Sequence, residues 1–462
     1  MTFDNQGFDP TISRRTLLRT AAGAGAGALV SRGLPAWAKP VIDAATHVRK
    51  PDSRPFPHLP AGHESMPEIK HVVMLMMENH SFDNLLGMVP YQVPGRQAVD
   101  GLTRKHGHFK NVNRDTDGSK VFAEHAASPC QLSGHPGQNW NASHESYDGG
   151  HNDGFVKASG PIAMRFWDQH DLPFTYSLVK HFPIGQRFFC SVLAQTYPNR
   201  RFFFAGTASG TISTDNTTFS VPAKNGTIFD RLDAHHIDYR IYYQNVPSWL
   251  IVPDILKPKG RADRQRKYSA FHADAAAGRL PAFTFIDPQY DTTSEENPQD
   301  IQVGERFVAD VVRTLMRAPT WKHTALFINY DEHGGYYDHV APPRAIKPDS
   351  TPPLLKPGDT PGAYDRYGFR VPMIVVSPWA KPNYLSNVVQ DHTSITAFIE
   401  RKWNLPAMTF RDANAQPMTD YFDFSKPAFL KPPALAKAPA LAPGLAACHS
   451  QGLNPPLPPG VR

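Results

Sequence analysis

The chain has 462 residues, of which 40% are hydrophobic and 11% aromatic, so it can bury a large core. This composition excludes a disordered protein, and a formal net charge of +6 is too small to indicate a nucleic-acid-binding protein. The three cysteines show no zinc-type spacing and are too few for a disulfide scaffold.

The first residues predict an export signal. Arg14 and Arg15 precede an apolar Ala/Gly-rich run over residues 21–30, and residues 36–38 (Ala-Trp-Ala) supply a small-x-small cleavage site. We therefore expect residues 1–38 to be a twin-arginine signal peptide that engages the twin-arginine export machinery, and the protein to be periplasmic or secreted. Because the run is too short to span a bilayer, we expect no stable membrane anchor.

Short apolar runs predict the strands of a central sheet. They occupy residues 71–77, 239–244, 282–287, 325–329 and 371–377. Continuous apolar runs are typical of strands buried on both faces. Between the third and fourth runs, apolar residues recur at helical spacing from Ile301 to Met316, and a strand-helix-strand order indicates parallel pairing. The predicted fold is therefore α/β with a mostly parallel sheet, and we expect residues 88–160 to form a long loop-rich excursion over it.

Two of the predicted strands end in side chains that bind metals. Glu78 and Asn79 follow the first run, and Asp331 and Glu332 follow the fourth. In an open parallel sheet the carboxyl ends of the strands form the ligand crevice, where carboxylates repel one another unless a cation offsets them. The sequence thus predicts a divalent metal ion, with oxygen ligands favouring Ca²⁺, Mg²⁺ or Mn²⁺ and nearby histidines leaving Zn²⁺ or Fe open. Each cluster taken alone is also compatible with a solvated strand end.

A third stretch supplies a hydroxyl group. Thr196 lies two residues before Pro198, which predicts a helix start whose free N–H groups favour an anion. With Arg200 and a metal nearby, this hydroxyl would be placed to attack phosphorus. From this stretch alone, Thr196 could equally be only an N-cap.

Several histidines are candidates for proton transfer. We expect His135, His144 or His333 to bind oxyanion charge or to protonate a leaving group, although a single histidine is more often structural. His80 is expected instead to stabilise the turn over residues 81–84.

Six blocks appear together in this order: "HVVMLMMENHSFDNLLG", "DGGHNDGF", "FCSVLAQTYPNR", "INYDEHGGYYDHVAPP", "GFRVPMIVVSPW" and "DHTSITAFIERKW". With them, residues 68–405 resemble the bacterial phosphoesterases that include phospholipase C enzymes and certain acid phosphatases. The resemblance implies an α/β/α sandwich similar to the alkaline phosphatase superfamily, with a metal at the carboxyl edge of the sheet. It implies that the metal is bound by Glu78, Asn79, Thr196, Asp331 and Glu332. Thr196 would also be the nucleophile that forms a phosphothreonine intermediate.

One element departs from this pattern. Where relatives commonly carry "EHP" or "HPxHD", this chain reads "SEENPQD", so Asn297 and Gln299 stand near positions that often hold histidine. Trp140, Tyr147 and Trp167 are candidates for a choline site by cation–π attraction, with simple packing as the alternative.

The expected function is an exported, metal-dependent phosphoesterase of phospholipase C type, hydrolysing phospholipids such as phosphatidylcholine. A broad-specificity acid phosphatase acting on small phosphate monoesters is the alternative, and a non-catalytic metal-binding protein is a third hypothesis. No basic amphipathic helix is evident for contact with a membrane surface. We expect an N-terminal extension over residues 39–67, a catalytic domain over 68–405 and a Pro/Ala-rich tail over 406–462.

Overall fold

The computed structural model describes residues 48–131 and 135–440. The predicted signal peptide, residues 1–38, lies outside these ranges. Among the helices of the described ranges, none combines the length and the apolar character needed to cross a membrane.

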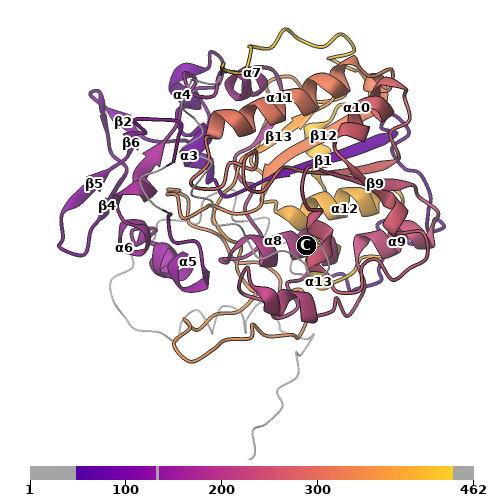
Figure 1. Cartoon of the computed structure of the whole chain (residues 1–462), viewed down its shortest axis with the longest axis horizontal. Coiled ribbons are helices and arrows are strands. Elements are labelled where there is room, and N and C mark those ends of the chain that lie inside the picture. The colour runs from indigo at the N-terminus through magenta and orange to yellow at the C-terminus, as the bar shows by residue number, and fades with distance from the viewer. Residues whose placement is uncertain (1–47, 132–134, 441–462) are drawn as a thin grey trace, which may run out of the picture.

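A twisted central sheet forms the middle layer of the molecule (Figure 1). Across the sheet its eight strands are β10 (Gln265–Lys267), β9 (Tyr239–Tyr243), β11 (Phe283–Asp287), β1 (His71–Met77), β12 (Thr324–Tyr330), β13 (Met373–Val376), β8 (Ile184–Gly185) and β14 (Leu385–Ser386). The central strands β1, β11 and β12 are buried along almost their whole length, as their continuous apolar sequences predict. All five predicted strands form, and the mostly parallel sheet is confirmed.

Helices cover both faces of the sheet, so the α/β/α sandwich is also confirmed. Figure 1 shows α7 (Pro173–His181), α10 (Ser269–Ala276) and α11 (Ile301–Arg317) above it, and α8 (Thr196–Ala205), α9 (Ile228–Ala234), α12 (His392–Lys402) and α13 (Phe410–Asn414) below it. The predicted crossover helix is α11, which connects β11 to β12 and buries the apolar side of its 17 residues.

The register of β1 against β12 places the functional segments. His71 pairs with Thr324 and Met77 with Tyr330, so the two parallel strands end at the same level. Glu78 directly follows β1 and Asp331 directly follows β12, so these two residues lie side by side at the carboxyl edge of the sheet.

Strand β13 differs from the sequence-based expectation of parallel pairing. It runs antiparallel to both of its neighbours, β12 and β8, while the other described strands of the sheet share one direction. No helical crossover separates β12 from β13, and an irregular segment over residues 331–372 joins them instead.

The boundary predicted at residue 406 falls inside the packed fold. Helix α13 follows it, and Met408, Arg411, Met418 and Tyr421 are buried. Apolar residues spaced among the prolines allow this segment to pack, and residues 441–462 of the predicted tail lie outside the described residues. The N-terminal extension is also attached to the fold, because Asn404 donates hydrogen bonds to backbone carbonyls of residues 56–60.

Residues 88–160 contain more regular structure than the predicted loop. They form α4 (Val89–Gln92), β2 (Arg104–Lys105), β3 (His108–Phe109), β4 (Val112–Arg114), β5 (Lys120–Phe122), β6 (Glu124–His125), α5 (Trp140–Tyr147) and α6 (Phe155–Ser159). These elements lie beyond α3 (Phe82–Leu86), the helix that follows β1, and therefore at the carboxyl side of the sheet (Figure 1).

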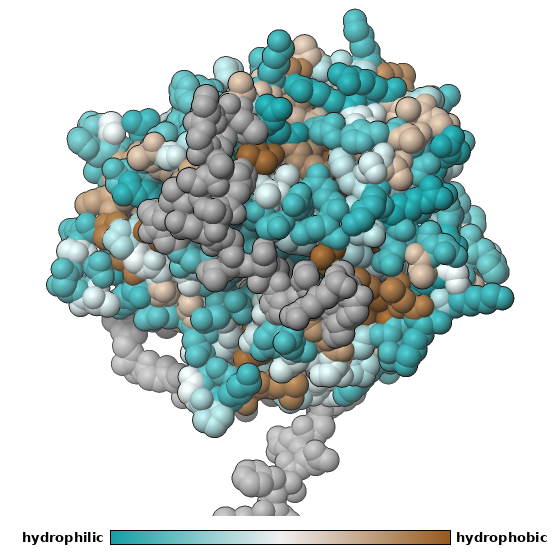
Figure 2. Space-filling model, viewed as in Figure 1, coloured by the Kyte–Doolittle hydropathy of each residue, from teal (hydrophilic) through white to brown (hydrophobic). Residues whose placement is uncertain are grey.

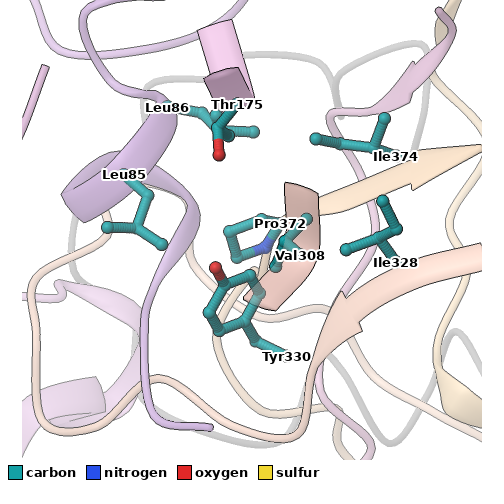
Figure 3. Close-up of a pocket in the computed structure, with 8 residues that line it drawn as sticks. All are labelled: Leu85, Leu86, Thr175, Val308, Ile328, Tyr330, Pro372 and Ile374. Carbon is teal, nitrogen blue, oxygen red and sulfur yellow. The ribbon is translucent and has the colours of Figure 1, made fainter. Parts of the chain in front are cut away.

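A small apolar pocket lies among α3, α11, β12 and β13 (Figure 3). It is lined by Leu85, Leu86, Thr175, Val308, Ile328, Tyr330, Pro372 and Ile374. None of the predicted metal ligands or catalytic side chains lines it, so we assign it to core packing.

Candidate active site

The two predicted strand ends meet at the carboxyl edge. The backbone N–H of Asp331 donates to the Met77 carbonyl over 3.1 Å, and Asp331 Oδ1 accepts the Asn79 backbone N–H at 3.2 Å. Asn79 takes a left-handed φ of 68°, which asparagine tolerates better than most residues. Asn79 and Asp331, 252 positions apart, are thus held together by direct hydrogen bonds.

Thr196 begins α8 and points at this junction. Gln195 is the N-cap, with no side-chain capping bond, so the alternative that Thr196 is only an N-cap is wrong. The Thr196 hydroxyl instead donates to Asn79 Oδ1 over 3.3 Å, and the residue is 3% exposed. A nearly buried hydroxyl therefore lies beside the strand-end residues and the N–H groups of a helix start.

Arg200 follows Thr196 by one helical turn and is fully buried. Its Nε lies 2.8 Å from Asp331 Oδ2, its Nη1 3.3 Å from Asp287 Oδ1 and its Nη2 3.8 Å from Glu78 Oε1. Burial alone would lower the pKa of this guanidinium, but the surrounding groups, Tyr290 and Asp331 foremost, raise it above its ordinary value. Because its donors are engaged by carboxylates, Arg200 holds the site residues in place.

The site contains more negative charge than its protein partners neutralise. Burial raises the pKa of Glu78 and Glu332 well above the ordinary range and that of Asp331 to about 6, with neighbouring carboxylates adding to each shift. Both carboxylate oxygens of Glu78 and Oε1 of Glu332 are buried without a hydrogen-bond partner. Buried carboxylate oxygens that lack hydrogen-bond partners are costly, so this donor set fits a divalent cation.

Two other groups within the described ranges hold acidic and histidine ligand atoms within 4.8 Å of one another: Asp83, Asp338 and His339, and His125, Asp168 and Asp171. In the first, Arg370 already supplies the positive charge, with Nε 2.8 Å from Asp338 and Nη2 3.1 Å from Asp83. The carboxylates of Glu78, Asp331 and Glu332 do not form so tight a group. The protein therefore offers several candidate metal-ligand groups.

His135 is paired with a carboxylate that the sequence reasoning missed. Its Nε2 lies 3.6 Å from Glu296 Oε1, which also accepts a hydrogen bond from Gln138. Glu296 raises the pKa of His135, whose side chain is 27% exposed. The charge of Glu296 also contributes to the raised pKa of Glu78. The sequence feature that could have indicated this pairing is Glu296 itself, the carboxylate immediately before Asn-Pro in "SEENPQD".

The other two predicted histidines have different surroundings. His333 Nδ1 lies 3.0 Å from Glu332 Oε2, and burial lowers the pKa of His333 to about 3, so the ring is neutral. The His144 ring packs 4.3 Å from Trp140, with Nδ1 bonded to the Trp140 carbonyl. Both of these His144 contacts are with Trp140, and neither involves Thr196. The catalytic roles of His144 and His333 remain predictions.

Three further sequence predictions concern neighbouring side chains. His80 bonds Asn84 Oδ1 at 2.6 Å, which confirms its part in the turn. Gln299 Oε1 accepts the backbone N–H groups of residues 294 and 295, and Gln299 Nε2 donates to the Tyr290 carbonyl, so this side chain braces the loop. Trp140 and Trp167 are each 2% exposed and pack in the interior, which favours the packing alternative over a choline site.

A buried hydroxyl at a helix start, beside acidic strand ends at the carboxyl edge of an α/β/α sandwich, is suited to hydrolysis of phosphoric esters. Residues 69–406 match the Phosphoesterase family. The chain belongs to this family and is a phosphoric ester hydrolase.

Two relatives, both phospholipases C by name, support the assignment. The chain is 30% identical to non-specific phospholipase C1 of Arabidopsis thaliana, over 78% of this chain and 72% of that protein. It is 27% identical to phospholipase C B of Mycobacterium tuberculosis, over 91% of this chain and 87% of that protein. Among solved structures, it is similar to a protein in the alkaline phosphatase superfamily from Vibrio parahaemolyticus, with 8% identity, a TM-score of 0.37, and coverage of 77% of this chain and 71% of that one.

Proposed function

We propose that this protein is an exported, metal-dependent phosphoesterase of phospholipase C type that hydrolyses phospholipids such as phosphatidylcholine. The observation that carries the proposal is the Thr196 hydroxyl, which lies 3.3 Å from Asn79 Oδ1 at the start of α8. The phospholipase C relatives support the choice of a lipid substrate.

Glu78, Asn79, Thr196, Asp331 and Glu332 would hold the divalent metal. When bound, it supplies positive charge that lowers the pKa of a coordinated hydroxyl and stabilises phosphoryl oxygens. Arg200 keeps Asp331 and Glu78 in position, and its positive charge offsets part of the negative charge that these two carboxylates would present to the ion.

The protein side chains then divide the reaction between them. The Thr196 hydroxyl, held by its hydrogen bond to Asn79 Oδ1, forms the bond from its oxygen to phosphorus and gives up its proton to water. The bond from phosphorus to the glycerol oxygen breaks, and His135 donates a proton to that oxygen. Water then hydrolyses the phosphothreonine, which releases the phosphorylated headgroup and restores the hydroxyl.

Two substitutions and two substrates test this function. Thr196→Ala should abolish hydrolysis of phosphatidylcholine, whereas Thr196→Ser should retain a measurable part of it, because serine keeps the nucleophilic oxygen. Release of diacylglycerol is measured beside release of p-nitrophenol from p-nitrophenyl phosphate. Strong turnover of the monoester with none of the lipid would replace the proposal with the acid phosphatase alternative. Full activity in Thr196→Ala would remove Thr196 as the nucleophile.

Export by the twin-arginine route is part of the proposal. It is supported by Arg14 and Arg15 before the apolar run and by the cleavage pattern at residues 36–38. Replacing both arginines by lysine should leave the protein inside the cell, as measured by fractionation. An unchanged exported fraction would contradict this route.

A further inference from the structure

A two-hairpin projection, residues 104–122, lies beside the candidate active site and contains none of the predicted site residues. It consists of β2 with β3 and of β4 with β5, each an antiparallel pair, and we call it the hairpin arm. Figure 1 shows these strands projecting from the body, on the side where the carboxyl ends of the central strands lie. In Figure 2 the same lobe carries mostly hydrophilic residues with a few hydrophobic ones among them.

The arm has an excess of positive charge that the protein does not neutralise. Its charged residues are Arg104, Lys105, Lys110, Arg114, Asp115, Asp117 and Lys120, which give a formal charge of +3, and all five basic side chains are exposed. Within residues 48–131 and 135–440, none of these five forms an ion pair with a carboxylate, whereas Arg231, Arg261 and Arg344 on other parts of the surface do. The two acidic side chains accept backbone N–H groups in the turn at the tip of the second hairpin.

Exposed aromatic rings lie among these cations. Phe122 on β5 is 47% exposed and Tyr91, beside β2, is 48% exposed. The Arg104 guanidinium lies 5.8 Å from the Tyr91 ring and 5.1 Å from the Phe109 ring. Aromatic rings beside basic side chains suit the interface between water and a bilayer, where the rings meet the headgroup level and the cations meet anionic lipid.

The base of the arm is attached to the walls of the site. Asn113 on β4 accepts the Phe155 backbone N–H at 2.8 Å and donates to the Asn152 carbonyl. The Phe155 ring packs 6.1 Å from that of His333, which in turn contacts Glu332. A surface that binds the arm would therefore lie close to the carboxyl edge that carries Thr196.

We propose that the hairpin arm docks the enzyme onto anionic phospholipid bilayers. Unpaired cations supply charge complementarity to the lipid surface, and Phe122 with Tyr91 enters the headgroup layer. The inference rests on the proposed action on phospholipids, since such an enzyme must reach a substrate that is embedded in a bilayer. A strand-built arm would do what a basic amphipathic helix does in other interfacial proteins.

Vesicle binding tests the charges. Thr196→Ala protein, which should leave the lipid intact, is sedimented with phosphatidylcholine vesicles that contain or lack an equal amount of phosphatidylglycerol. Combining Lys105→Glu, Lys110→Glu and Lys120→Glu should weaken binding to the anionic vesicles about a hundredfold. Binding of the unmutated arm should also fall as salt is raised. The matched control combines Lys70→Glu, Lys322→Glu and Lys431→Glu, three exposed lysines, of which the first two precede β1 and β12 at the opposite edge of the sheet.

A second variant tests the aromatic contribution. Phe122→Ser should weaken vesicle binding several-fold even at high salt, whereas Leu430→Ser, at another exposed apolar residue, should not. With Thr196 intact, every arm variant should still release p-nitrophenol from water-soluble p-nitrophenylphosphorylcholine at the parental rate.

The outcomes separate the two proposals. If the Thr196→Ala protein binds anionic vesicles equally well with and without the three arm lysines, or binds neutral vesicles as tightly as anionic ones, while the parent protein cleaves phosphodiesters, docking by the arm is wrong. If the protein binds a single-stranded RNA through the arm under conditions in which it does not bind vesicles, the partner is nucleic acid and the inference also fails. If the unmutated protein cleaves no phosphodiester at all, the proposed function fails whatever the vesicles show.

Discussion

The α-carbon of Gly334 packs against the backbone of Asn79, so that a Cβ at Gly334 would lie 1.9 Å from the Asn79 carbonyl oxygen. Gly334 takes φ +64° and Asn79 φ 68°, and the turns that follow β12 and β1 therefore interlock. No alternative side-chain rotamer can relieve such a clash, because both atoms belong to, or are fixed by, the backbone.

Gly334→Ala should therefore destabilise the protein and disturb the site. Gly149 is a matched control, because its φ of +61° is similar and a Cβ added there would have no atom within 4 Å. We expect Gly149→Ala to lower the free energy of unfolding by about 1 kcal/mol through backbone strain, and Gly334→Ala by roughly 1–3 kcal/mol more through overpacking. Denaturant unfolding measures both. Equal losses in the two variants would show that the turns do not interlock.

Glu78→Gln should have opposite effects on the metal-free and metal-loaded protein. Without metal, burial and the neighbouring Glu296 disfavour the Glu78 carboxylate, so its removal should raise the melting temperature in the presence of a chelator. With metal added, the loss of a ligand should lower both the bound metal and the melting temperature relative to the parent.

Glu400→Gln is the control for this effect. Glu400 is also buried with a raised pKa, but the groups around it are Asp412, Arg49 and Arg231 rather than the predicted ligands. Its effect on the melting temperature should be the same with and without metal. If the change in melting temperature caused by Glu78→Gln is likewise the same with and without metal, Glu78 is not a ligand.

Glu296→Gln should move the pH dependence of catalysis. Glu296 raises the pKa of His135, so His135 stays protonated to higher pH than a free imidazole and can serve as the acid. Loss of the carboxylate lowers that pKa, and the alkaline limb of the kcat/KM profile should shift to lower pH. His135→Asn should remove the limb altogether. An alkaline limb unchanged in Glu296→Gln would contradict the assignment of His135 as proton donor.

The ion-pair network of His339 predicts a loss of stability at alkaline pH. His339 Nδ1 lies 2.6 Å from Asp83 Oδ2, and His339 Nε2 lies 3.0 Å from Asp100 Oδ1. Burial and the charge of Arg370 oppose the charged ring, but these two carboxylates raise the pKa of His339 to about 10. A raised folded pKa gives stability that is complete below the unfolded value of about 6.5. That stability should decline as the pH rises from there through about 10.

The measurement compares His339→Gln with the parent protein. The difference in the free energy of unfolding between them should shrink steadily from neutral pH to pH 10. A difference that stays constant over this interval would mean that His339 is not protonated in the folded protein.

The strands and the candidate site were predictable from the sequence to different extents. Strand β1 forms over the predicted residues 71–77, because an uninterrupted apolar run has no stable place except the interior of a sheet. The direction of β13 was not predictable, because an apolar run is equally compatible with a parallel and an antiparallel strand. Only the absence of a crossover helix distinguishes these two directions. Likewise, Glu296 lies far in sequence from His135, and only the folded chain shows their pairing.

The role of Arg200 shows the same limit within the site. From its place close behind Thr196, the sequence predicts Arg200 beside the attack on phosphorus. In the structure its guanidinium is fully buried against Asp331, Asp287 and Glu78, which no local sequence pattern indicates.

The reversed strand β13 has a consequence for how the site can vary. The segment joining β12 to β13 leaves the sheet at its carboxyl edge and returns to the same edge, whereas each parallel connection must cross to the opposite one. A change in the length of residues 340–368 would therefore leave the order and direction of the strands unaltered, provided that packed residues such as Tyr364 are kept. The segment thus begins and ends beside the candidate site, between Asp331, a predicted metal ligand, and Arg370, which pairs with Asp83 and Asp338.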